Sequence, residues 1–178
     1  MEIWQEIGVD PETGAERLVA EYKNRLFRAA MLMCRDPAVA EDLLFRTFAQ
    51  VVGRIRTYRP ELSFYNWIYT IMLNFRRKDL RHQAADRLEL TEEVPETVAE
   101  RTAFTELVRK SESQMVREAV SQLPLALSET VVLRYFECMS IEEVASILSI
   151  PTGTVKSRLN HARRRLRTLL AERLEVGK

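Results

Sequence analysis

The hydrophobic residues in the first half of the chain recur at intervals of three and four, which predicts a series of amphipathic helices. One such stripe runs through residues 15–34, and a second begins after Asp36-Pro37, a pair typical of a helix start. A third stripe follows Ser63 and leads into the basic stretch Arg76-Arg77-Lys78. We therefore expect three consecutive helices in this half.

The periodicity is lost over residues 84–100, which contain six acidic residues and one proline. It returns near Phe104, and the chain has only 5 Gly and 6 Pro in 178 residues. Few helix breakers and no alternating strand pattern favour an all-α fold. We predict two small helical domains, 1–83 and 113–178, joined by an acidic linker over 84–112.

The second half carries the signals of a helix-turn-helix. Ser128 is predicted to cap one helix, and Ser140 with Glu143 three residues later forms a capping box that opens the next. Ser149-Ile150-Pro151 then predicts a tight turn, and a further helix is expected from Thr152. Two short helices joined by a tight turn are the arrangement of a helix-turn-helix motif.

The last of these helices is strongly asymmetric. Its apolar residues repeat at four, three, four and three, and so form one buried seam: Val155, Leu159, Ala162, Leu166 and Leu169. Between Lys156 and Arg167 there are six Lys or Arg residues and no acid. A solvated basic face is the alternative interpretation. In this context, however, the pattern favours DNA binding, with early residues at base edges and cations at phosphates.

A second candidate site is aromatic. Six aromatic residues fall between positions 58 and 75, with arginines on both sides. Aromatic rings stack on unpaired bases while neighbouring cations follow the backbone. Trp67 lies on the apolar stripe, which favours a place in the core. Tyr65 and Tyr69 lie off that stripe, so they and Tyr58 are the better candidates for base contact.

Composition and charge exclude several classes of protein. The net charge is +1, but it is divided into +2 for residues 1–83, −4 for 84–118 and +3 for 119–178. The two cysteines and two histidines show no metal-ligand spacing, and no phosphate-binding glycine loop or nucleophile–base pair is present. We expect no metal, no cofactor and no enzyme activity. Without a signal peptide or a membrane-spanning apolar run, we expect a cytoplasmic protein with no membrane insertion.

Several stretches resemble the extracytoplasmic-function (ECF) group of bacterial RNA polymerase sigma factors. Residues 36–44, followed by Thr47-Phe48, resemble the segment of that family that binds core polymerase. The promoter-melting helix of the family is similar to Ser63-Phe64, Trp67-Ile68-Tyr69 and Asn74. The C-terminal domain of the family is similar to Leu123-Pro124 and to residues 133–137, 140–145 and 153–159.

The resemblance implies a sigma factor that directs promoter-specific initiation. Its partners would be core RNA polymerase, at the clamp coiled coil and the flap, promoter DNA and an anti-sigma factor. The residues implied at core polymerase are Glu41, Asp42, Thr47, Phe48 and Val51. Those implied at unpaired minus-ten bases are Tyr58, Arg59, Phe64, Tyr65, Asn74 and Arg77. Those implied at the minus-thirty-five duplex are Thr154, Lys156, Ser157, Arg158, Asn160, His161, Arg164 and Arg167.

Two positions depart from the family pattern. Phe45-Arg46 stands where the family usually has Gln-Glu, and Cys138 stands where it usually has glycine. The first departure changes the chemistry expected on the polymerase-binding face, and the second changes a turn that glycine commonly forms. The alternative to a sigma factor is a helix-turn-helix regulator that does not bind core polymerase in this way.

Overall fold

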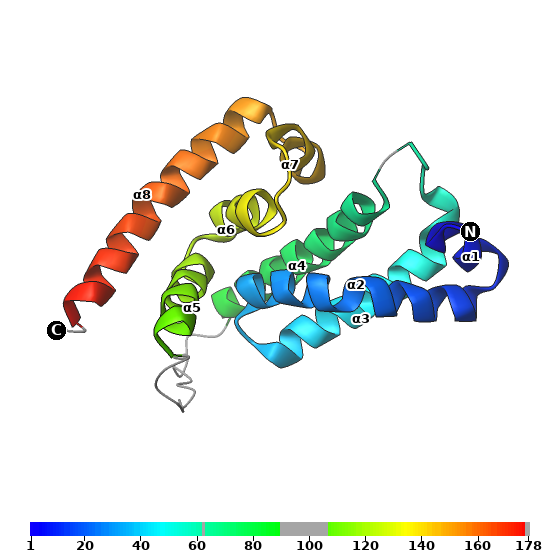
Figure 1. The fold of residues 1–178 in the computed structure, drawn as a ribbon, viewed down its shortest axis with the longest axis horizontal. Coiled ribbons are helices and arrows are strands. Elements are labelled where there is room, and N and C mark those ends of the chain that lie inside the picture. Colours follow the sequence, from blue (N-terminus) through cyan, green and yellow to red (C-terminus); the bar gives the residue numbers. More distant parts are fainter. Residues whose placement is uncertain (62, 90–106, 177–178) are drawn as a thin grey trace.

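The computed structural model describes residues 1–61, 63–89 and 107–176, and within them the chain is helical with no strand (Figure 1). The all-α prediction is confirmed. The elements are α1 (Ile3–Val9), α2 (Pro11–Cys34), α3 (Pro37–Arg54), the 3-10 turn η1 (Ile55–Thr57), α4 (Phe64–Glu89), α5 (Leu107–Ser121), α6 (Leu125–Val131), the π-helical turn η2 (Val132–Phe136), α7 (Ile141–Leu148) and α8 (Thr152–Val176).

Part of the segment predicted to be a linker, residues 84–112, is helical in the structure. Helix α4 continues to Glu89 and α5 begins at Leu107, so both ends of the predicted segment are helical. Residues 90–106 lie outside the described residues. The domain boundaries drawn from the sequence therefore stay predictions.

Most helix starts follow the capping residues read from the sequence. Asp36 caps α3, because its carboxylate accepts from the Ala38 backbone N–H at 2.8 Å with proline in the next position. Ser63 accepts from the Asn66 backbone N–H at 3.4 Å at the start of α4. These starts are confirmed, since each depends only on residues within one helical turn.

Helix α2 begins at Pro11 with Asp10 as its cap, because the Asp10 carboxylate accepts from the Glu12 N–H at 3.2 Å. One local prediction was wrong. Ser128 does not start a helix. Helix α6 begins one residue after Pro124, and the Ser128 hydroxyl donates to the Leu125 carbonyl at 3.2 Å. Pro124 is the N-cap of α6, a position where its missing N–H costs no helical hydrogen bond.

The N-terminal half packs α2, α3 and α4 around a shared apolar core, to which α1 adds Ile3 and Ile7. Arg46 on α3 crosses to α4, donating to both carboxylate oxygens of Asp79 at 2.9 and 2.6 Å. A two-point arginine–carboxylate pair fixes orientation as well as distance. It therefore holds the register between α3 and α4.

The C-terminal half packs α7 and α8 against α6 and η2, burying the seam predicted for α8. Val155, Leu159 and Ala162 are buried, and Leu166 is partly buried against the same core. Between η2 and α7, the chain turns at Cys138 with φ 56°, the left-handed conformation that glycine adopts without strain. The replacement of glycine by Cys138 therefore leaves the left-handed turn in place.

Candidate nucleic-acid interface

The helix-turn-helix is held by local hydrogen bonds. The Ser140 hydroxyl accepts from the Glu143 N–H at 3.1 Å, and the Glu143 carboxylate accepts from the Ser140 N–H at 2.8 Å. That backbone hydrogen bond holds the pKa of Glu143 below its ordinary value. Ser149 ends α7 in the left-handed conformation, φ 55°, before Pro151 and the start of α8. The predicted capping box and turn are confirmed.

Helix α8 presents its polar residues on the side opposite the buried seam. Thr154 and Arg158, at the edges of this face, are partly buried. The other six residues predicted for the minus-thirty-five duplex are exposed: Lys156, Ser157, Asn160, His161, Arg164 and Arg167. A basic, exposed helix that follows a tight turn can enter a major groove. The geometry therefore leaves all eight predicted residues accessible.

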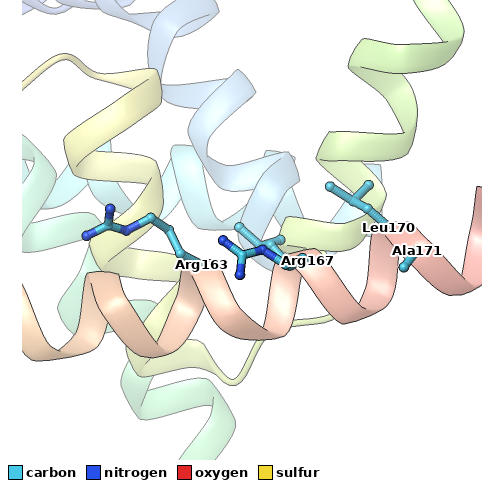
Figure 2. A pocket seen from close by; sticks show the side chains of 5 residues that line it. Arg163, Arg167, Leu170 and Ala171 are labelled. Atoms are coloured by element: carbon cyan, nitrogen blue, oxygen red, sulfur yellow. The ribbon is translucent and has the colours of Figure 1, made fainter.

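Arg163 adds a contact that the prediction did not include. Its guanidinium donates to the side-chain oxygen of Asn160, three residues earlier on α8. Figure 2 shows Arg163 and Arg167 beside a shallow hollow whose other lining residues are Leu166, Leu170 and Ala171. The sequence signal for this pair was the spacing of three residues between Asn160 and Arg163 on a predicted helix, since side chains at that spacing are neighbours. Arg163 therefore orients the amide of Asn160.

The aromatic residues of the N-terminal half meet at the chain between η1 and α4. The Tyr58 ring centre lies 4.9 Å from that of Phe64 and 5.3 Å from that of Trp67. All three rings are partly buried, while Arg59 and Asn74 are exposed. The three rings form one aromatic cluster, and a partly exposed cluster of rings suits unpaired bases.

Tyr65 and Tyr69 do not belong to that cluster. Tyr65 is 8% exposed and Tyr69 is fully buried. Burial raises the pKa of both phenols above the ordinary value. The Tyr65 hydroxyl donates to Glu137 at 2.8 Å. In this arrangement of the chain both tyrosines are covered, so their contact with bases stays a prediction that requires them to be uncovered first.

The cover comes from the C-terminal half. Glu137 also accepts from the Arg25 side-chain Nε at 2.7 Å, and the Arg25 guanidinium lies 3.9 Å from the centre of the Tyr65 ring. A second buried carboxylate, Glu129, accepts from Arg77 at 3.0 and 2.8 Å. Two carboxylates of the C-terminal half thus occupy side chains of the N-terminal half, among them the predicted minus-ten residues Tyr65 and Arg77.

The predicted polymerase-binding residues divide into surface and core. Glu41 and Asp42 are exposed and Phe48 is partly exposed. Thr47 and Val51 are fully buried, and the Thr47 hydroxyl donates to the Leu43 carbonyl at 2.7 Å. The contact of these two with core polymerase stays a prediction, and in this structure their side chains do not reach the surface.

Phe45 and Arg46, the two residues that depart from the family pattern, differ in their surroundings. Arg46 turns toward Asp79 and Asp42, with its Nε 2.8 Å from the Asp42 carboxylate. Phe45 is 74% exposed beside Asp42. Phe45 therefore adds an exposed ring to this surface, and Arg46 changes it as well by pairing with the exposed carboxylate of Asp42.

Across residues 1–61, 63–89 and 107–176, no three His, Cys, Asp or Glu side chains gather as a metal site. In the same part of the chain, no helix has both the length and the apolar character needed to cross a membrane.

Comparison with known families gives two matches. Residues 18–85 match the model of sigma-70 region 2, and residues 113–166 match that of sigma-70 region 4. The first contains most of α2, all of α3 and most of α4, and the second contains the helix-turn-helix up to residue 166 of α8. Both candidate surfaces thus lie within matched segments, except for Arg167, which is one residue beyond the second.

Similar proteins cover nearly the whole chain. RNA polymerase sigma factor CarQ of Myxococcus xanthus is 32% identical, over 92% of this chain and 93% of its own length. RNA polymerase sigma-E factor of Streptomyces coelicolor is 31% identical, over 89% and 86%. The fold resembles the sigma factor RpoE crystallised with the anti-sigma factor NepR from Bartonella quintana, with a TM-score of 0.73, 23% identity and coverage of 88% and 96%. It also resembles CnrH in complex with the cytosolic domain of CnrY, with a TM-score of 0.68, 24% identity and coverage of 96% of both chains. With both regions present in order and relatives matched along their length, the chain belongs to the ECF group of RNA polymerase sigma factors.

Proposed function

We propose that the two halves of this sigma factor bind different forms of promoter DNA. Helix α8 reads duplex DNA, and the N-terminal half binds melted DNA. The observation that carries the proposal is the exposed basic face of α8, where Lys156, Ser157 and Asn160 lie in the early turns of the helix. Side chains at this position of a helix-turn-helix meet base edges, whereas Arg164 and Arg167 are placed for phosphates further along.

The minus-ten element would be bound by the rings of Tyr58, Phe64 and Trp67, together with the exposed side chains of Arg59 and Asn74. The rings of Tyr58, Phe64 and Trp67 are only partly buried, so a stacked base can still reach them. Tyr65 and Arg77 can take part only after the C-terminal half releases them, because Glu137 and Glu129 hold them now. The proposal therefore includes separation of the halves on promoter binding.

Core polymerase would meet the exposed side of α3 through Glu41, Asp42 and Phe48, with Phe45 as an added apolar contact. Glu41 and Asp42 are both exposed and the Phe45 ring is 74% exposed, which supports this assignment. The match to region 2 argues against a regulator that carries a helix-turn-helix alone. We assign the chain no catalytic step and place its action in the cytoplasm, with polymerase.

Transcription with purified core polymerase tests the assignment. We expect a specific run-off product with the wild type, and weaker core binding for the double variant Glu41→Lys, Asp42→Lys. Glu16→Lys, at an exposed acid on α2, is the matched control. If the double variant binds core as tightly as the control does, the α3 surface is not the polymerase contact.

We also propose an anti-sigma partner. The two neighbours of similar fold were solved as complexes with the anti-sigma factor NepR and with CnrY. Copurification of the tagged chain from its own cell, repeated with core polymerase in excess, tests this. Competition between a bound protein and core supports it, and a bound protein that core never displaces contradicts it.

A further inference from the structure

Helix α1 lies before the residues that match region 2, yet it packs next to the segment predicted to meet melted DNA. Ile3 and Ile7 are buried against α2, and Glu6 pairs with Arg17. Figure 1 shows α1 beside the chain that joins α3 to α4. Contact between α1 and η1 places the remaining large residue of this helix, Trp4, next to that connection.

Trp4 packs on Tyr58. Their ring centres are 5.7 Å apart and tilted by 60°, a favourable geometry for two aromatic rings. Tyr58 also contacts Phe64 and Trp67, both from α4. Trp4 is thus the ring that approaches Tyr58 from outside the matched region, and it limits the directions in which the Tyr58 side chain can turn.

The position of α1 is itself tightly set. A Cβ added at Gly14 would lie 2.5 Å from the Ile7 backbone nitrogen, closer than such atoms approach. At the turn, the Thr13 hydroxyl donates to the Asp10 carboxylate at 2.6 Å. The two helices therefore touch backbone to backbone, and the place of Trp4 follows from that contact.

We propose that Trp4 is a positioning residue for promoter melting, holding Tyr58 in the orientation in which it receives an unpaired base. This inference rests on the function proposed above for Tyr58. Trp4 acts through Tyr58, so its loss lowers the yield of melted promoter. Binding to core polymerase and to duplex DNA is retained, because those surfaces lie on α3 and α8.

The experiment uses the full chain with core polymerase on a promoter that it transcribes. Permanganate reactivity of promoter thymines is measured per bound complex for Trp4→Ala, Trp4→Phe and Gly14→Ala. Val9→Ala is the control, since Val9 is 78% exposed on the same helix. We expect Trp4→Ala and Gly14→Ala to lower the melted fraction by about fivefold or more, the loss that follows from weakening one stacked base. Trp4→Phe retains most of the melting, and Val9→Ala retains all of it.

A Tyr58→Ala variant separates this inference from the function on which it rests. Normal melting by Tyr58→Ala removes the proposed function of the ring cluster. Defective melting by Tyr58→Ala together with normal melting by both Trp4→Ala and Gly14→Ala overturns the positioning role alone. A fall in core binding that parallels the melting defect of Trp4→Ala also overturns it, because that pattern belongs to a general loss of structure.

Discussion

Removal of one oxygen atom at Tyr65 measures how firmly the two halves hold together. Tyr65→Phe deletes the hydroxyl that donates to Glu137 at 2.8 Å but keeps the ring beneath Arg25. A hydrogen bond to a charged group contributes about 1.5–3 kcal/mol. Since Glu137 keeps its bond from Arg25 at 2.7 Å, the lower end applies. We expect the free energy of unfolding to fall by about 1.5 kcal/mol, roughly tenfold in the equilibrium constant.

Urea unfolding of Tyr65→Phe, Glu137→Gln and the double variant gives the coupling between the two residues. Tyr135→Phe is the matched control, because Tyr135 is 53% exposed, and we expect a change within about 0.5 kcal/mol. Residues in contact show a coupling of about 0.5 kcal/mol or more. Additive effects of Tyr65→Phe and Glu137→Gln would refute the reasoning, since they would mean that this contact is not formed in solution.

Three further outcomes are expected. Asn160→Ala shifts the preferred base in a randomised minus-thirty-five library, whereas Arg167→Ala keeps the preference but lowers the salt dependence of binding by about one unit of slope. Phe45→Ala weakens binding to core polymerase in a titration and leaves the melting temperature unchanged, because its side chain is 74% exposed. Ser140→Ala lowers the free energy of unfolding by about 1 kcal/mol in urea, since the Glu143 N–H loses its acceptor at 3.1 Å, and an unchanged value would contradict the cap.

Features that depend on residues close in sequence could be predicted. The Asp36 cap, the box at Ser140 and Glu143, and the seam that begins at Val155 all rest on spacings of two to four residues. The exposed face of α8 follows from the same pattern, because the seam fixes which side of the helix is buried. This is the part of the candidate site for which the sequence was sufficient.

The place of Tyr65 could not be predicted in this way. Its partner Glu137 is 72 positions away along the chain, and the apolar stripe of α4 describes only one of the surfaces that cover that helix. The burial of Thr47 could not be predicted for a related reason. Its hydroxyl donates to the Leu43 carbonyl within α3, so this polar residue lies in the core without an unpaired polar group. Polar residues used inside a fold carry no hydrophobic signal.

The backbone contact at Gly14 constrains how this sequence can vary over generations. Any change of a glycine codon that alters the residue adds at least a Cβ, and at Gly14 that atom would lie 2.6 Å from the Ile7 Cα. At Gly8 and Gly53 the same atom would meet nothing within 4 Å, and alanine in a helix is favoured over glycine by about 0.5–1 kcal/mol. Descendants of this chain are therefore free to lose the glycines at 8 and 53, while position 14 admits replacement only if α1 moves off α2.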